Sequence, residues 1–177
     1  MAIKHPGRKG DRLEEEVASI IRKNWKLPDE DSAERSARSG NYRTEIGDIK
    51  FNIGMYIPIL VECRNREQWK YANIFEFTGN VKIWWDKDCY AEMEELQKKT
   101  GKVHLALLIL TRKYQKRFVI FNTQNVKDFL KENAEFSFDF DEFYSDAYFC
   151  IKLGNGFFVM YADDFFNVLT FDRYNKN

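Results

Sequence analysis

Two carboxylates and one cation in the first half of the chain have the types and spacing of a metal-binding site. Asp48 lies fourteen positions before Glu62, in the stretch GDIKFNIGMYIPILVECRNR. The runs at residues 46–53 and 57–61 have strand character, so a hairpin is predicted to bring the two carboxylates alongside each other. Glu62 and Arg64 are two positions apart and therefore point to the same side of a strand.

This set of residues suits metal-assisted hydrolysis of a phosphodiester. Mg²⁺ prefers hard oxygen ligands, and Mn²⁺ can take its place. A bound ion of this kind lowers the pKa of its water and offsets charge on phosphate oxygens. We predict Asp48 and Glu62 as metal ligands, the backbone carbonyl of Cys63 as a third ligand and Arg64 as a cation that stabilises developing charge. The alternative is that Asp48 caps a turn while Glu62 and Arg64 form a surface ion pair worth about 0–1 kcal/mol.

The N-terminal part of the chain supplies a further acid. Residues 11–25 carry apolar side chains at three- and four-residue spacing, which predicts an amphipathic helix. Glu14 falls on the edge of the apolar stripe, where it could bind a metal water or a second metal ion.

Basic residues before the predicted hairpin are candidates for contacts with phosphates. Residues 27–45 are polar and are predicted to form a loop, which is either an ordinary surface loop or a phosphate-binding one. The predicted DNA-binding residues are Arg8, Lys9, Arg38, Ser39 and Arg43.

The remaining pattern predicts a mixed α/β domain with a central sheet and helices on its faces. Its further elements are a helix at 81–100, a strand buried on both faces at 103–110, a strand at 118–121 and a short helix from about 123 to 131. We predict a core domain at residues 1–132, with an aromatic and acidic, β-rich C-terminal extension at residues 133–177 packed on it.

Charge and composition limit the classes of protein that fit. Formal net charge is zero, but residues 1–117 carry 23 basic against 18 acidic side chains, and residues 118–177 carry 5 against 10. The basic part favours DNA as a partner, and the acidic, aromatic part favours a protein partner. The three cysteines show neither zinc nor disulfide spacing. With no run long enough for a bilayer and no signal-peptide pattern, a cytoplasmic protein without membrane contact is expected.

Four short motifs in order resemble the archaeal-type Holliday junction resolvases of the PD-(D/E)xK superfamily, which have a restriction-endonuclease-like fold. The motifs are R-K-G-x-x-x-E at 8–14, R-S-G at 38–40, G-D-I at 47–49 and I-L-V-E-C-R at 59–64. The similarity extends over about residues 8–121. It implies that Glu14, Asp48 and Glu62 are metal-binding acids, that Ser39 matches a loop serine, and that a homodimer cuts branched DNA.

The sequence departs from this family at two places. Arg64 stands where the family has lysine, and Gly47 stands where the superfamily name has proline. Arginine keeps its proton beside a metal, so it stabilises charge but is a poor general base. Lys50 on the same predicted strand, or Gln68 as a residue that positions water, could replace the lysine.

The sequence therefore predicts a Mg²⁺- or Mn²⁺-dependent DNA endonuclease, with branched DNA as one substrate. Two alternatives stay open at this point. One is a catalytically inactive nuclease fold that serves as a DNA-binding or interaction module. The other is a restriction-type endonuclease that reads sequence.

Overall fold

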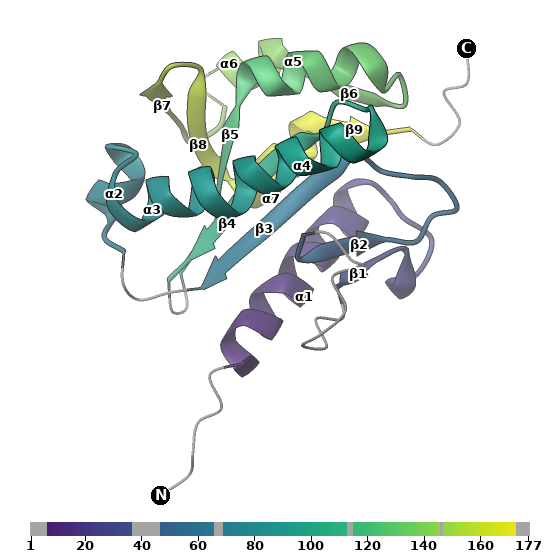
Figure 1. The fold of residues 1–177 in the computed structure, drawn as a ribbon, viewed down its shortest axis with the longest axis horizontal. Helices are drawn as coiled ribbons and strands as arrows, with labels where there is room; N and C mark the ends of the chain where they lie inside the picture. The colour runs from purple at the N-terminus through teal and green to yellow at the C-terminus, as the bar shows by residue number, and fades with distance from the viewer. Residues whose placement is uncertain (1–6, 37–46, 66–68, 113–114, 146, 173–177) are drawn as a thin grey trace, which may run out of the picture.

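A five-stranded mixed sheet forms the centre of the protein (Figure 1). The computed structural model describes residues 7–36, 47–65, 69–112, 115–145 and 147–172, with side chains from residue 12 onward. Within these residues the strand order is β3-β4-β5-β8-β7. The strands are β3 (Ile59–Asn65), β4 (Leu105–Thr111), β5 (Phe118–Asn122), β8 (Phe157–Tyr161) and β7 (Cys150–Gly154). β3 and β4 are parallel and the other pairs are antiparallel.

Helices cover both faces of this sheet and bury two clusters of apolar side chains. The first core is made with α1 (Gly7–Asn24), α5 (Thr123–Glu132), α6 (Phe140–Tyr144) and α7 (Ala162–Val168). The second core is made with α2 (Tyr71–Phe75), α3 (Gly79–Trp84), η2 (Trp85–Tyr90) and α4 (Ala91–Thr100). In Figure 1 the run from α3 to α4 crosses in front of β3 and β4. The predicted α/β architecture is confirmed.

The predicted elements from residue 81 to 132 are confirmed with small differences. The helix expected at 81–100 is α3, η2 and α4 in succession, and Gly101 ends it with a left-handed φ of 68°. All seven residues of β4 are buried, as expected for a strand covered on both faces. Asn122 caps α5 by accepting hydrogen bonds from the N–H groups of Gln124 and Asn125.

The pairing expected around Asp48 is different in the structure. β2 (Ile49–Phe51) forms its ladder with β1 (Ala33–Arg35), from a segment predicted to be a loop, instead of a hairpin with β3. The loop prediction rested on polarity, but Ala33 is fully buried in the first core. Asp48, directly before β2, contacts β3, where its N–H donates to Val61 O at 2.8 Å.

The C-terminal part of the chain contributes to the same sheet and the same core. β8 pairs with β5 along five residue pairs, and β6 (Phe136–Phe138) pairs with β9 (Leu169–Phe171). Trp25, just after α1, donates its ring N–H to Leu169 O at 2.7 Å. The division into a core at 1–132 and an extension at 133–177 stays a prediction about folding units. In the described part of the chain, every helix is too short or too polar to cross a membrane.

A substitution in α7 tests how the C-terminal segment folds. Phe165 is 0% exposed and its ring lies 4.7 Å from that of Phe121 in β5. We expect Phe165→Ala to lower the free energy of unfolding by about 3–5 kcal/mol, since it leaves a cavity in the first core. Urea denaturation followed by circular dichroism measures this.

Phe149→Ala is the matched control, because Phe149 is 40% exposed and should lose under about 1 kcal/mol. A single transition that shifts as a whole indicates one cooperative unit. A separate early transition, affected alone by Phe165→Ala, would show that residues 133–177 fold as their own unit.

Candidate active site

The open edge of β3 holds Asp48 in place by two backbone contacts. β4 occupies one edge of β3, and along the other edge the N–H and C=O groups of alternate residues need partners. Asp48 N–H donates to Val61 O at 2.8 Å, and Cys63 N–H donates to Asp48 Oδ2 at 2.8 Å. Asp48 is therefore fixed at its main chain and at its carboxylate by the strand that carries Glu62.

Gly47 allows this close approach to β3. Its φ is +73°, and a Cβ at this position would lie 2.9 Å from Leu60 Cδ1 and 3.2 Å from Val61 O. Proline fixes φ near about −65°, so it cannot adopt this conformation. Glycine where the superfamily name has proline is thus a requirement of the local backbone.

Arg64 contacts four oxygen-bearing groups with one guanidinium. Its Nη2 lies 2.9 Å from Glu62 Oε2 and 2.7 Å from Asp88 Oδ2. Its Nη1 lies 3.4 Å from Asp48 Oδ2 and donates to Cys63 O at 3.0 Å. The side chains of Asp48 and Glu62 are each 1% exposed, that of Arg64 is 16% and that of Asp88 is 36% exposed. The site therefore runs from two buried carboxylates outward to Asp88.

The electrostatics of the site fix two protonation states. Burial acts to lower the pKa of Arg64, but attraction by Glu62, Asp88 and Asp48 outweighs burial and raises the pKa above its usual value. Arg64 is therefore a permanent cation and not a general base. Burial, with the charge of Asp48 next in effect, raises the pKa of the Cys63 thiol well above its ordinary value. Cys63 remains a thiol, which excludes it as a nucleophile at neutral pH.

Three of the predicted metal ligands, Asp48, Glu62 and the Cys63 carbonyl, lie around a single cation. Asp48 Oδ2, Glu62 Oε2 and Cys63 O are all in contact with the Arg64 guanidinium, and all three are hard oxygen donors of the kind that Mg²⁺ and Mn²⁺ prefer. This donor set fits a divalent ion.

Glu14 approaches β3 from the opposite face of the sheet. α1 packs in the first core with Val61 and Cys63, whereas Glu62 and Arg64 point to the side of the second core. Glu14 Oε2 lies 2.9 Å from Arg35 Nε of β1. Within the described part of the chain, no three His, Cys, Asp or Glu side chains gather as a metal-binding cluster. The role of Glu14 as a metal ligand stays a prediction.

The predicted DNA-binding set is outside what the structure describes. Arg8 and Lys9 belong to the first turns of α1, of which the structure describes the backbone only. Arg38, Ser39 and Arg43 lie outside the described residues, as does Gln68, a candidate replacement for the family lysine. The other candidate, Lys50, has its Nζ 3.9 Å from Glu34 Oε1 on β1.

Asp88 is the site residue that sequence reasoning missed. It lies on η2, 24 positions after Arg64, and its Oδ2 also accepts a hydrogen bond from Arg64 Nε at 3.3 Å. The helix around it is a π-helical turn, a form that occurs frequently at functional sites. The one sequence signal for such an acid is that Arg64 has no counterion of its own when Glu62 is taken as a metal ligand.

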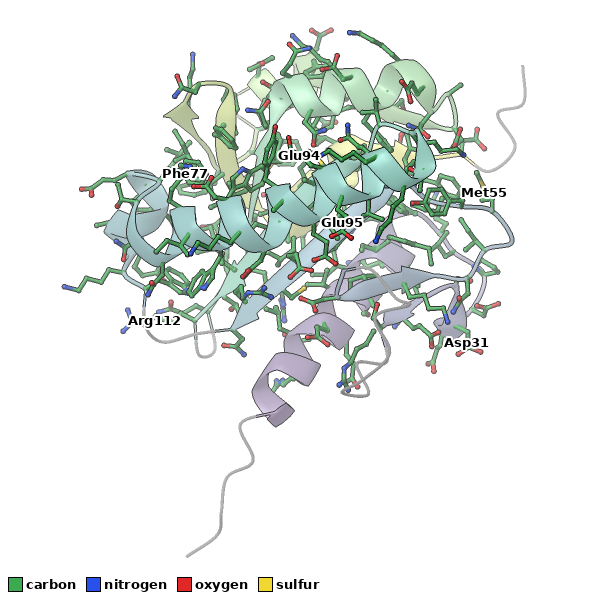
Figure 2. All side chains as sticks on the ribbon, viewed as in Figure 1. Asp31, Met55, Phe77, Glu94, Glu95 and Arg112 are labelled. Carbon is green, nitrogen blue, oxygen red and sulfur yellow. The ribbon has the colours of Figure 1, made fainter. Side chains whose placement is uncertain are left out.

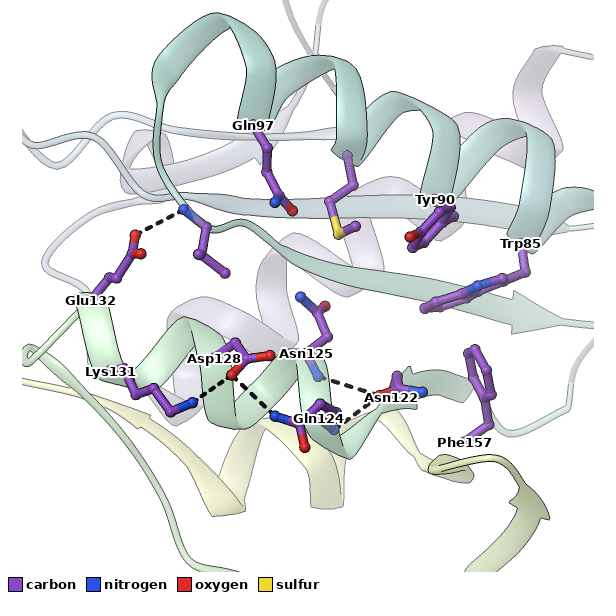
Figure 3. Close-up of a pocket in the computed structure, with 12 residues that line it drawn as sticks. Trp85, Tyr90, Gln97, Asn122, Gln124, Asn125, Asp128, Lys131, Glu132 and Phe157 are labelled. Atoms are coloured by element: carbon purple, nitrogen blue, oxygen red, sulfur yellow. Dashed lines mark hydrogen bonds and ion pairs between the residues drawn. The ribbon is translucent and has the colours of Figure 1, made fainter.

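A cavity of about 510 Å³ lies elsewhere, between α4 and α5 (Figure 3). Two of its amide side chains stabilise the fold. Asn125 forms hydrogen bonds with the backbone of His104 and Ala106, and Asn122 caps α5. Neither Asp48 nor Glu62 lines this cavity. The candidate active site is therefore the carboxylate group at the edge of β3.

The comparison with protein families agrees with this fold. Residues 7–157 match the family described as phage putative PDDEXK endonuclease, and the chain belongs to this family. The mixed sheet with helices on both faces is consistent with the restriction-endonuclease-like fold of the PD-(D/E)xK superfamily. No curated protein and no solved structure matches the chain. The family supports a nuclease and leaves the resolvase type as a proposal.

A glycine substitution tests the attachment of Asp48 to β3. Gly47→Ala combines an unfavourable φ of +73° with the 2.9 Å approach to Leu60. Gly101→Ala is the matched control, since its φ is +68° and nothing lies within 4 Å of the added carbon.

We expect a loss of about 1–2 kcal/mol for Gly101→Ala from backbone strain alone, and a further 1–3 kcal/mol or so for Gly47→Ala from the clash. Chemical denaturation of the two variants gives the difference. Equal losses would show that the close approach at Gly47 has no energetic role.

Proposed function

We propose that this protein is a metal-dependent DNA endonuclease that hydrolyses phosphodiester bonds at the edge of β3. The observation that carries this proposal is the convergence of Asp48 Oδ2, Glu62 Oε2 and Cys63 O on one cationic group. Membership of a PDDEXK endonuclease family supports the class of activity. A bound Mg²⁺ or Mn²⁺ would supply a water of lowered pKa and neutralise charge on the phosphate.

The residues of the chain have distinct tasks in this proposal. Asp48 and Glu62 hold the metal with the Cys63 carbonyl, and the two backbone contacts to Asp48 keep its carboxylate from turning away. Arg64 faces the substrate phosphate as a permanent cation, so it stabilises negative charge in the transition state without exchanging a proton. Glu14 is a candidate for a water of the metal or for a second metal.

The substrate and assembly are proposed from the resemblance and the charge distribution. Similarity of the ordered motifs to archaeal-type Holliday junction resolvases supports branched DNA as a substrate and a homodimer as the working form. The basic character of residues 1–117 supports binding to phosphates. We also propose a cytoplasmic location, and a protein partner that binds the acidic, aromatic residues 133–177.

Substitution of the two inner carboxylates tests the proposal directly. We expect Asp48→Asn and Glu62→Gln each to lower cleavage by about 100-fold or more, since a neutral amide is a poor metal ligand. The assay uses a labelled four-way junction, a linear duplex of matching sequence and single-stranded DNA, with Mg²⁺ or Mn²⁺. Thermal melting confirms that each variant is folded.

Glu94→Gln is the matched control, because Glu94 is an exposed carboxylate on α4 (Figure 2). Unchanged cutting by Asp48→Asn and Glu62→Gln would reject the proposed site. Cutting of the junction alone supports the resolvase type, and cutting of the linear duplex at fixed sequences supports a restriction-type enzyme.

The replacement of lysine by Arg64 favours a second candidate, a nuclease fold without catalysis that binds DNA or a partner. Salt-sensitive binding of DNA by the parent protein with no cutting of any substrate supports this candidate. Arg64→Lys is then the variant expected to recover cleavage, since lysine is the residue of the related enzymes.

A further inference from the structure

Arg64 is shared between an inner and an outer set of acids. On the inner side its guanidinium contacts Glu62 at 2.9 Å and Asp48 at 3.4 Å, and both of these carboxylates are buried. On the outer side it contacts Asp88 through both Nη2 and Nε, at 2.7 and 3.3 Å. The same nitrogen, Nη2, contacts both Glu62 and Asp88. A small rotation of the Arg64 side chain would therefore bring it closer to either carboxylate.

The position of Asp88 depends on the π-helical turn. η2 interrupts an otherwise continuous helical run from Gly79 to Thr100, and a π turn contains one residue more than an α turn. Around Asp88, Trp85 and Cys89 are buried in the second core, while Asp86 is exposed and paired with Lys82. The turn therefore holds Asp88 between the core and the solvent, opposite Arg64.

A divalent ion and the Arg64 guanidinium would compete for the inner oxygens. Arg64 reaches Asp48 Oδ2, Glu62 Oε2 and Cys63 O, which are the atoms proposed to bind the metal. A divalent ion on these oxygens would be repelled by a guanidinium that stayed in place, at a separation where Coulomb energies are large in a buried site. A withdrawal of Arg64 would relieve this repulsion, and Asp88, which Arg64 already contacts, is the more exposed acid on the solvent side.

We propose that Arg64 is an exchangeable internal cation, which holds Asp48 and Glu62 in the metal-free protein and moves onto Asp88 when a divalent ion takes their oxygens. This inference rests on the proposed metal-dependent function. Asp88 is a positioning residue that acts through Arg64 and leaves the cation close enough to face a substrate phosphate. It also compensates for the presence of arginine where related enzymes have lysine.

Affinity for Mn²⁺ reports this exchange without any cleavage assay. Without the Asp88 charge, the described acids in contact with Arg64 are the inner carboxylates alone, so the ion must displace Arg64 with no described outer acid to receive it. We expect Asp88→Asn to raise the Kd for Mn²⁺ by about 5- to 20-fold, the size of a typical coupling between two sites. Isothermal titration calorimetry and the melting temperature with and without Mn²⁺ measure this. Asp86→Asn, on the same turn but paired with Lys82, is the matched control and should leave the Kd unchanged.

A double-mutant cycle separates an action through Arg64 from a direct action of Asp88. Arg64→Met removes the competing cation, so we expect tighter Mn²⁺ binding, a lower melting temperature without metal and a large recovery of it with metal. In the Arg64→Met background, Asp88→Asn should then have no effect on the Kd. If it weakens binding there as much as in the parent, Asp88 acts directly on the ion and the exchange is rejected.

Two further results would also overturn the proposal. An Asp88→Asn variant that melts lower by the same amount with and without Mn²⁺, at unchanged Kd, would make Asp88 a purely structural partner. A parent protein that binds no Mn²⁺ would remove the exchange altogether. Failure of the nuclease proposal is distinguishable, because a protein that cuts no DNA but shows the full cycle in Mn²⁺ binding retains the exchange.

Discussion

Two carboxylates buried beside each other at the edge of a sheet are the constraint on which the rest of this site depends. Asp48 and Glu62 are nearly inaccessible to solvent, and burial of charged groups is costly unless they are paired and hydrogen bonded. The chain meets this cost with a backbone N–H from Cys63 and with the Arg64 guanidinium. Both partners belong to β3. Arg64 lies two positions after Glu62, and the Cys63 N–H faces Asp48 across the strand edge.

The architecture around the site keeps one edge of β3 available. β4 pairs with β3 in parallel through the connection that contains α2, α3 and α4, so this connection crosses the face to which Glu62 and Arg64 point. The C-terminal strands extend the sheet on the far side, next to β5, and leave the Asp48 edge of β3 alone. Because Asp88 lies on this helical connection, it contacts Arg64 together with the two inner acids.

Arginine in the place of lysine changes how many carboxylates the residue at position 64 can contact. A guanidinium is planar and has five donors, so it can bind several carboxylates at once, whereas a lysine ammonium is a compact charge. Arg64 uses this capacity on Glu62, Asp48, Asp88 and the Cys63 carbonyl together. In this site η2 provides an additional acid, Asp88, beside the arginine.

Much of the fold followed from sequence patterns, and three residues predicted from the sequence, Asp48, Glu62 and Arg64, lie in contact in the structure. The periodic apolar residues of α1, the continuous apolar run of β4 and the alternation at Glu62 and Arg64 depend on local geometry, which adjacent residues encode. The tertiary structure decided the pairing of β2 with β1, the approach of Gly47 to Leu60 and the contact of Arg64 with Asp88. These features join segments that are distant along the chain, and a shift of one residue in a helical turn changes which side chain faces the site. Such contacts are set by packing between elements, for which a single sequence carries no periodic signal.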